Sequence, residues 1–172
     1  PVNWAYLDNN ATTRPLPAVV AAVQEALGEG FGNPSSLHGA GAAAKRILDE
    51  GRQSVANLLA CRETEVIFTS GATESLNTAL RSAVASVEES RRRILISAVE
   101  HEAVFEIAED LEKHHGVTVV RIPVDSDGAL DLERLGHELQ RPAALVSVML
   151  ANNETGVIFP VAEVAALAHR HD

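Results

Sequence analysis

Side chains that could take part in chemistry follow three apolar runs in this sequence, and the first group is the hydroxyls of Thr69–Ser75. This segment comes directly after Val66–Phe68 and opens a stretch with helical spacing. The free N–H groups and the dipole at a helix N-terminus bind anions, and the Thr73 hydroxyl adds a further donor. Ordinary capping of the helix by Ser70 or Thr73 explains the same residues equally well. This segment alone therefore leaves both interpretations open.

His101 and the amides of Asn152–Gly156 stand at similar places further along the chain, each after an apolar run. In a parallel sheet the carboxyl ends of the strands lie at one edge, and ligands bind outside that edge. His101 has the chemistry to stack on a planar cofactor or exchange a proton, although a loop histidine without function is the alternative. Asn and Gly also favour plain turns. Three successive polar strand ends at one edge nonetheless favour a ligand site.

Two other motifs match known sites only superficially. A zinc motif beginning at His101 would need a second histidine where Phe105 stands, so no metal site is expected. Gly39–Ala44 fits the glycine pattern of a nucleotide-binding turn, but no strand is predicted before it and no acidic strand end follows at the right distance. Both interpretations are rejected.

Apolar runs and helical stretches alternate from Val66 onward, which predicts an α/β fold with a mainly parallel sheet flanked by helices. Strands are predicted at Val66–Thr69, Ile94–Ser97, Val117–Ile122 and Ala144–Met149, and helices at Ala72–Ala85, Ala103–His114, Leu130–Leu139 and Val161–His169. The earlier part contains no predicted strand, only helices near Pro15–Leu27 and Leu37–Leu59. We expect an N-terminal arm with helices over residues 1–60 and the first part of an incomplete α/β cofactor-binding domain over 61–172.

Composition narrows the function classes. There are 24 acidic and 14 basic residues, a net charge of −10 that argues against a nucleic-acid partner. Arg91–Arg93 is interpreted as a solvated connector into a buried strand. With Cys61 alone no intrachain disulfide can form, and no leader or membrane-spanning stretch is visible, so a cytoplasmic protein without a membrane partner is expected.

Five short sequence motifs occur in a fixed order along the chain. They are LDNNATT (7–13), FGNPSSLH (31–38), FTSGATES (68–75), VEHEAV (99–104) and NNETG (152–156). Together they resemble the class V aminotransferase enzymes, and more narrowly the NifS-like cysteine desulfurases that use pyridoxal 5'-phosphate (PLP). The resemblance implies the PLP-dependent fold type I.

The resemblance also implies roles for individual residues. Ala72 and Thr73 are similar to the pair that binds the PLP phosphate, His101 to the catalytic histidine that stacks on the pyridine ring and shuttles protons, and Asn153 to the asparagine beside cofactor and substrate carboxylate. The implied reaction converts L-cysteine to L-alanine and leaves a persulfide on the enzyme. The implied partners are a second copy of the chain in a homodimer and a sulfur acceptor or scaffold protein of iron–sulfur cluster assembly.

The family's cofactor lysine has no counterpart among the two lysines of this chain, Lys45 and Lys113. At about 1.5 Å per helical residue, Lys113 would lie roughly 18 Å from the ligand edge. Cys61 ends a helix and is interpreted as a small, half-buried apolar residue rather than the sulfur acceptor. We therefore expect a piece of a longer polypeptide that is inactive alone. Selenocysteine lyase, an aminotransferase, or a binding or dimerisation module remain alternatives.

Overall fold

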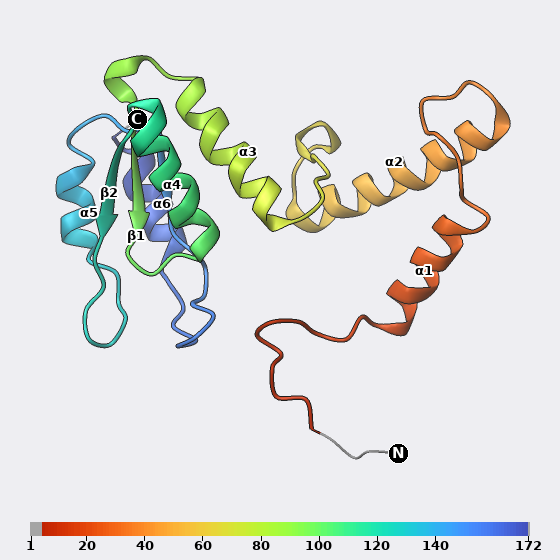
Figure 1. The fold of residues 1–172 in the computed structure, drawn as a ribbon, viewed down its shortest axis with the longest axis horizontal. Coiled ribbons are helices and arrows are strands. Elements are labelled where there is room, and N and C mark those ends of the chain that lie inside the picture. The colour runs from red at the N-terminus through yellow and green to blue at the C-terminus, as the bar shows by residue number, and fades with distance from the viewer. Residues whose placement is uncertain (1–4, 172) are drawn as a thin grey trace. The chain divides into compact units, whose positions relative to one another are not determined.

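The computed structural model describes residues 5–171, which form two compact units, residues 5–68 and 69–171 (Figure 1). The boundary between the two units in the chain falls after Phe68, whereas the N-terminal part expected from the sequence ends at residue 60. Residues 1–4 and 172, which the predicted parts include, lie outside the described residues.

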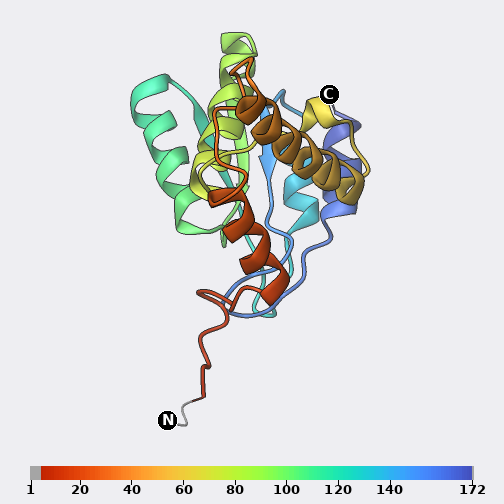
Figure 2. The ribbon, with the colours of Figure 1, turned by 90° about the vertical axis from the view of Figure 1, so that its right-hand side faces the viewer.

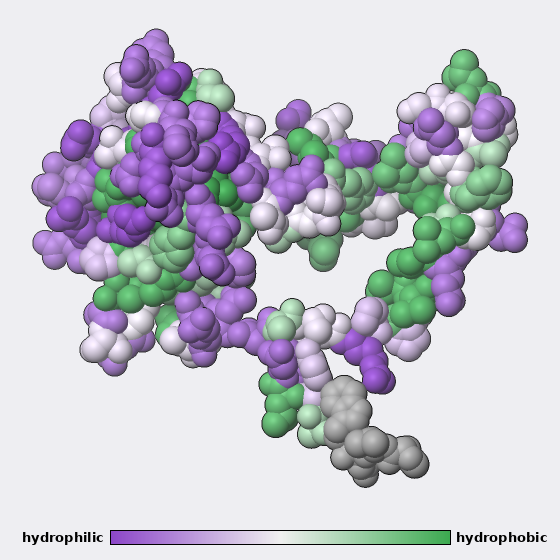
Figure 3. All heavy atoms as spheres, viewed as in Figure 1, coloured by the Kyte–Doolittle hydropathy of each residue, from purple (hydrophilic) through white to green (hydrophobic). Residues whose placement is uncertain are grey.

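The first unit is built from helices. It contains α1 (Pro17–Leu27), α2 (Gly39–Leu59) and the short 3₁₀ helix η1 (Glu63–Glu65). A proline in the first turn starts α1, and the His38 imidazole caps α2 by accepting the backbone N–H of Gly41. Within residues 5–60 no strand is found, as predicted. Apolar side chains are exposed along α1 (Figure 3), namely Val19, Val20, Val23 and Leu27.

Gly41 explains why a glycine pattern opens α2 without any nucleotide-binding turn. A Cβ atom at this position would lie 2.2 Å from the carbonyl oxygen of Ser36, so only glycine allows the two backbones to approach. No strand precedes the helix in the described chain, because the segment before it is a turn. The glycine is therefore required by packing.

The predicted strand at Val66–Thr69 is wrong. Strands form only where a neighbour completes the ladder, and this segment pairs with none of the strands in residues 5–171. The Val66 carbonyl instead accepts a hydrogen bond from Arg52, whose guanidinium lies 5.0 Å from the ring centroid of Phe68. Ile67 is 76% exposed. The run is extended, but its backbone bonds lie outside any sheet.

The second unit alternates helices and strands around one parallel sheet. In chain order it contains α3 (Ala72–Ala85), the 3₁₀ helix η2 (Glu89–Arg91), β1 (Arg93–Ser97), α4 (Glu102–His115), β2 (Thr118–Ile122), α5 (Leu132–Glu138), β3 (Leu145–Ser147) and α6 (Val161–His169). The strand order is β2-β1-β3, and both pairings are parallel. The α/β class with a parallel sheet flanked by helices is confirmed.

Helices cover both sides of the sheet (Figure 2), and its central strand β1 contributes to a core layer on each side. Ile94 and Ile96 pack with α3 and α4, and Leu95 between them packs with α5 and α6, as expected for side chains that alternate across a strand. All three are fully buried. A strand covered on both faces reads as a continuous apolar run, which is why β1 could be predicted.

Arg93 corrects the prediction that Arg91–Arg93 is a solvated connector. It is the first residue of β1, is only 4% exposed, and forms an ion pair with Glu138 of α5. Its guanidinium also donates to the Glu138 carbonyl at 2.8 Å. The carboxylate and the free carbonyl at the end of α5 satisfy the charge, so the arginine can enter the strand.

Within residues 5–171, no helix combines the length and apolarity that crossing a membrane would require.

Candidate functional site

Two loops leave the same end of the sheet side by side. Strands β1 and β3 are parallel neighbours, with Ile96 opposite Ser147. The loop after β1 leads to His101, and the loop after β3 leads to Asn153. Parallel pairing thus places these two sequence-predicted residues in adjacent loops.

His101 is the N-cap of α4. Its Nδ1 accepts the backbone N–H of Ala103 at 3.1 Å, and the residue is exposed. Because Nδ1 acts as an acceptor, the neutral ring carries its proton on Nε2. The histidine therefore has a structural function, and Nε2 is the atom available for proton exchange.

Asn152 organises the second loop. Its Oδ1 accepts the N–H groups of Glu154 and Thr155 at 3.0 and 2.9 Å, and its Nδ2 donates to the carbonyl of Val99 at 3.3 Å. This is the turn geometry typical of asparagine. Asn153 is exposed, and its side chain makes no hydrogen bond within residues 5–171. Its amide is thus the one available to a ligand.

Glu100 belongs to the loop after β1, bonds to the loop after β3, and is 9% exposed. Its Oε1 accepts the Ser97 hydroxyl at 3.0 Å and the backbone N–H of Met149 at 2.8 Å. Burial raises the pKa of this carboxyl, while the bonds from Ser97 and Met149 and the proximity of His101 act in the opposite direction. Burial has the largest effect because it removes water from the charged form.

The N-terminus of α3 carries the predicted anion-binding pair, Ala72 and Thr73, and both residues are exposed. The N-cap is Gly71, and no side chain caps the helix. Capping by Ser70 or Thr73 is therefore not observed. Instead, the Glu74 carboxylate accepts both the N–H and the hydroxyl of Ser70, at 2.7 and 2.6 Å, and these bonds lower its pKa.

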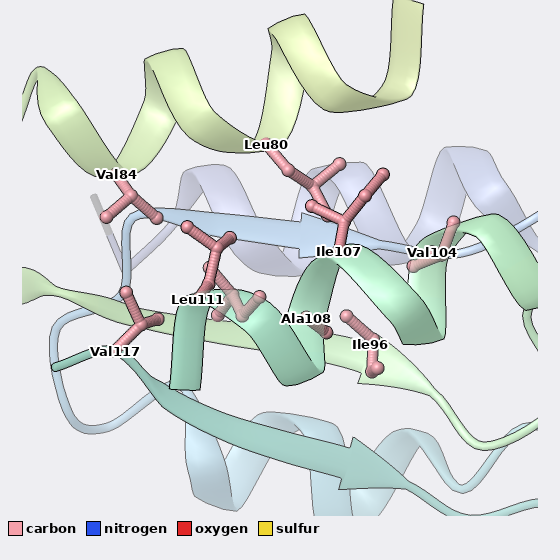
Figure 4. Packing of buried hydrophobic residues seen from close by; sticks show 9 residues of the cluster. Leu80, Val84, Ile96, Val104, Ile107, Ala108, Leu111 and Val117 are labelled. Atoms are coloured by element: carbon pink, nitrogen blue, oxygen red, sulfur yellow. The ribbon is translucent and has the colours of Figure 1, made fainter. Parts of the chain in front are cut away.

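Helices α3 and α4 run in the same direction, opposite to the strands (Figure 4). Leu80 of α3 packs near Ile107 of α4, and Val84 lies one turn further along near Leu111. The N-termini of both helices therefore lie at the end of the layer where the strands finish. Among the described residues, however, no hydrogen bond joins Thr69–Ser75 to either loop.

A polar chain ties the first turn of α3 to α4. Asn77 donates to the carbonyl of Thr73 at 3.1 Å and accepts a bond from Arg81 at 3.1 Å. Arg81 in turn pairs with Asp110 of α4 at 2.8 Å. The orientation of α3 against α4 thus rests on this chain and on the apolar layer beneath it.

The donors at this end of the sheet fit a phosphorylated, planar aromatic ligand. N–H groups of the first turn and a hydroxyl suit a phosphate, an exposed imidazole suits a ring, and a free amide suits a carboxylate. Each of the two lysines forms an ion pair on its own helix: Lys45 pairs with Asp49 at 2.6 Å, and Lys113 pairs with Glu109. Lys113 lies in the last turn of α4, at the opposite end from His101.

Sequence reasoning missed Glu100 and the organising role of Asn152. The sequence does contain a signal for Glu100. An acidic residue directly after the mainly apolar segment Ile94–Val99 is expected to be buried, and a buried carboxyl group needs hydrogen-bond donors. Ser97, three residues earlier, is one such donor. No comparable signal distinguishes Asn152 from Asn153, since both are asparagines in a turn.

Known proteins resemble this chain over nearly its whole length. The family profile described as Aminotransferase class-V matches residues 5–172. A protein of Cereibacter sphaeroides named cysteine desulfurase is 53% identical over 166 residues, covering 96% of this chain and 43% of the relative. The chain thus spans about two-fifths of that relative's length.

Solved structures give the same picture. A structure described as a NifS-like protein superposes with a TM-score of 0.92 at 38% identity, covering 97% of this chain and 46% of that one. A second, described as SspA in complex with cysteine, gives a TM-score of 0.89 at 26% identity, with coverages of 97% and 48%. The sheet order and flanking helices are therefore those of the N-terminal parts of longer proteins.

Proposed function

Because the chain belongs to the class V aminotransferase family, we propose that it supplies the N-terminal part of a PLP-dependent cysteine desulfurase. In this reaction the Cβ–Sγ bond of L-cysteine breaks and the sulfur passes to an enzyme thiol. The products are L-alanine and an enzyme persulfide, so atoms and electrons balance. The relative from Cereibacter sphaeroides bears this activity in its name, which supports the proposal. The observation that carries it is the pair of adjacent loops presenting Nε2 of His101 and the free amide of Asn153.

The chain's own residues have distinct functions in this proposal. The backbone N–H groups of Ala72 and Thr73, with the Thr73 hydroxyl, would hold the PLP phosphate. The His101 ring would stack on the pyridine ring and move a proton at Nε2, while Nδ1 keeps its bond to the first turn of α4. The Asn153 amide binds the carboxylate of the substrate. When bound, PLP supplies an electron sink for carbanion chemistry.

The assembly we propose is a cytoplasmic homodimer that donates sulfur to an acceptor or scaffold protein of iron–sulfur cluster assembly. The exposed apolar side chains on α1 support a contact between this helix and another protein surface, such as that of a second subunit. The acidic composition supports the absence of a nucleic-acid partner.

Turnover of L-cysteine tests the proposal. The polypeptide to assay contains this chain together with a cofactor lysine and an acceptor cysteine, for instance the C-terminal part of the Cereibacter sphaeroides relative. We expect alanine and, with a thiol reductant, sulfide in equal amounts. Absence of both from a PLP-loaded protein would reject the assignment.

Further measurements distinguish three other functions, two of them on the same polypeptide. Selenocysteine cleavage without cysteine cleavage would indicate a selenocysteine lyase, and amino transfer to a 2-oxo acid would indicate an aminotransferase. A binding or dimerisation module is indicated if the PLP-loaded polypeptide turns over none of these substrates while the 172-residue chain alone forms a stable dimer. Sedimentation velocity measures this last property directly.

A further inference from the structure

Glu100 is a buried acidic side chain that the proposed function does not use. Its neighbour in sequence is His101, and its hydrogen-bond partner from the neighbouring strand end is Met149, the second residue after β3 in the loop that leads to Asn153. A second bond, from Asn152 Nδ2 to the carbonyl of Val99, runs between the same two loops. The loops are thus joined by two hydrogen bonds, at residues that precede His101 and Asn153 in the chain.

The details of the link favour a positioning function over a purely structural one. Ser97 is fully buried at the end of β1, and its hydroxyl holds Oε1 of Glu100 in place for Met149. A shorter apolar side chain would bury the same strand end without desolvating a carboxylate, which is costly. The two hydrogen bonds to Oε1 offset part of this cost, and one of them fixes Met149 at the start of the Asn153 loop.

We propose that Glu100 is a positioning residue that fixes the Asn153 loop against the His101 loop, so that amide and imidazole keep one relative arrangement. The inference rests on the proposed function for the tasks of His101 and Asn153. The link itself involves only residues within the second unit and is measurable without cofactor or substrate.

Three substitutions separate position from charge. Glu100→Gln keeps an acceptor at the same distance, Glu100→Asp keeps the charge but is one methylene shorter, and Glu100→Ala removes both. The matched control is Glu106→Ala, an exposed acid on α4 outside the link. We expect Ala and Asp to break the link and Gln to preserve it.

The first measurement is amide hydrogen exchange and ¹⁵N relaxation of the 172-residue chain. Loss of a hydrogen bond to a charged acceptor should speed exchange of the Met149 N–H by about 10- to 100-fold and increase the mobility of Asn153. Glu100→Gln and Glu106→Ala should leave both near the wild-type values. Unchanged exchange in Glu100→Asp, or equal loosening in Glu100→Gln, would overturn the inference even if Glu100→Ala fails to fold.

The second measurement is steady-state kinetics of the polypeptide used for cysteine turnover. A displaced Asn153 should raise KM for L-cysteine, and a displaced His101 should lower kcat, with Glu100→Gln restoring both. Loosened loops with unchanged kcat and KM would reduce Glu100 to a structural residue. If the wild-type protein does not turn over cysteine, the proposed function fails, while the exchange and relaxation data still decide whether Glu100 positions the loop.

Discussion

Asn152 and Asn153 are adjacent in the chain, yet their side chains have opposite surroundings. Asn152 uses both ends of its amide within the protein, accepting from Glu154 and Thr155 and donating to Val99. The Asn153 side chain is exposed and makes no hydrogen bond to any residue in the described range 5–171. One asparagine therefore builds the loop and the other is presented by it.

Alanine at these two positions should separate stability from function. Asn152→Ala leaves several backbone groups without partners and should lower the free energy of unfolding by about 1–3 kcal/mol. Asn153→Ala should change it by less than about 0.5 kcal/mol, while raising KM for L-cysteine in the active polypeptide. Urea unfolding and steady-state kinetics measure the two effects. The reverse pattern would show that Asn152 is the ligand-binding amide.

Thr73→Val tests the phosphate site. Valine keeps the shape of threonine and removes one hydroxyl donor to a charged group, so PLP should bind about 10- to 100-fold more weakly to the active polypeptide. Thr78→Val is the matched control, because Thr78 is exposed on the same helix but beyond its first turn. Titration of the apoprotein with PLP gives both affinities. Equal affinities for the two variants would remove Thr73 from the site.

His101 needs two substitutions, because it both caps α4 and is proposed to move a proton. Asparagine retains a capping oxygen, so His101→Asn should remain close to wild type in stability, whereas His101→Ala should lose about 1 kcal/mol. Both should slow cysteine turnover by about 10²–10⁴-fold if Nε2 transfers the proton. Thermal unfolding and kcat separate the two functions. Full activity in His101→Asn would leave the histidine with its capping function alone.

Helices and buried strands could be predicted where local pattern and tertiary packing agree. Ala72–Ala85 and Val161–His169 have the predicted bounds, because apolar residues at helical spacing meet the sheet there. Gly116 has a φ of 65° and ends α4, a conformation that glycine adopts without strain. Val66–Thr69 has the composition of a strand, but a strand also needs a neighbour, and composition cannot supply one.

The candidate site was predictable only in part. Strand order is not contained in local pattern, so the adjacency of the His101 and Asn153 loops rested on the expected parallel sheet. The choice of Asn153 over Asn152 came from a family resemblance, since the two residues are chemically identical. The burial of Glu100 and Arg93 depends on partners more than 40 positions away in the sequence, Met149 and Glu138. Neighbouring residues offer Glu100 only the Ser97 hydroxyl, and they do not reveal the distant partners Met149 and Glu138.

Glu100 should make the stability of the chain depend on pH in a direction opposite to that of a salt-bridged acid. Its folded-state pKa is raised above the ordinary value of 4.5, chiefly by burial. The folded state then binds the proton more tightly than the unfolded state does. The stability contributed by the protonated carboxyl is fully present below pH 4.5 and is lost as the pH rises through the raised pKa.

Comparison with Glu100→Gln isolates this contribution, because glutamine does not titrate. The difference in free energy of unfolding, wild type minus variant, should fall as the pH rises from 4.5 and then level off above the folded pKa. Other acids, such as Glu74, whose pKa is lowered, contribute equally to both proteins and cancel. Denaturant unfolding at a series of pH values measures the difference. A difference that rises with pH would show that hydrogen bonding to the carboxylate outweighs its burial.

The two lysines give the last prediction, which concerns the 172-residue chain itself. Retention of an aldehyde cofactor needs a lysine placed at the site, and Lys45 and Lys113 are exposed and paired with Asp49 and Glu109 on their own helices. The N–H groups near Thr73 can still bind the phosphate weakly, since they do not depend on a lysine. Mixed with PLP, the chain should therefore form no specific lysine adduct and release neither alanine nor sulfide from cysteine. Borohydride reduction followed by peptide mapping distinguishes a specific adduct from scattered surface modification. Lys45→Arg and Lys113→Arg serve as matched controls, because they keep the charge and cannot form the adduct. A single stoichiometric adduct on either lysine, accompanied by turnover, would overturn the placement of the site at the ends of β1 and β3.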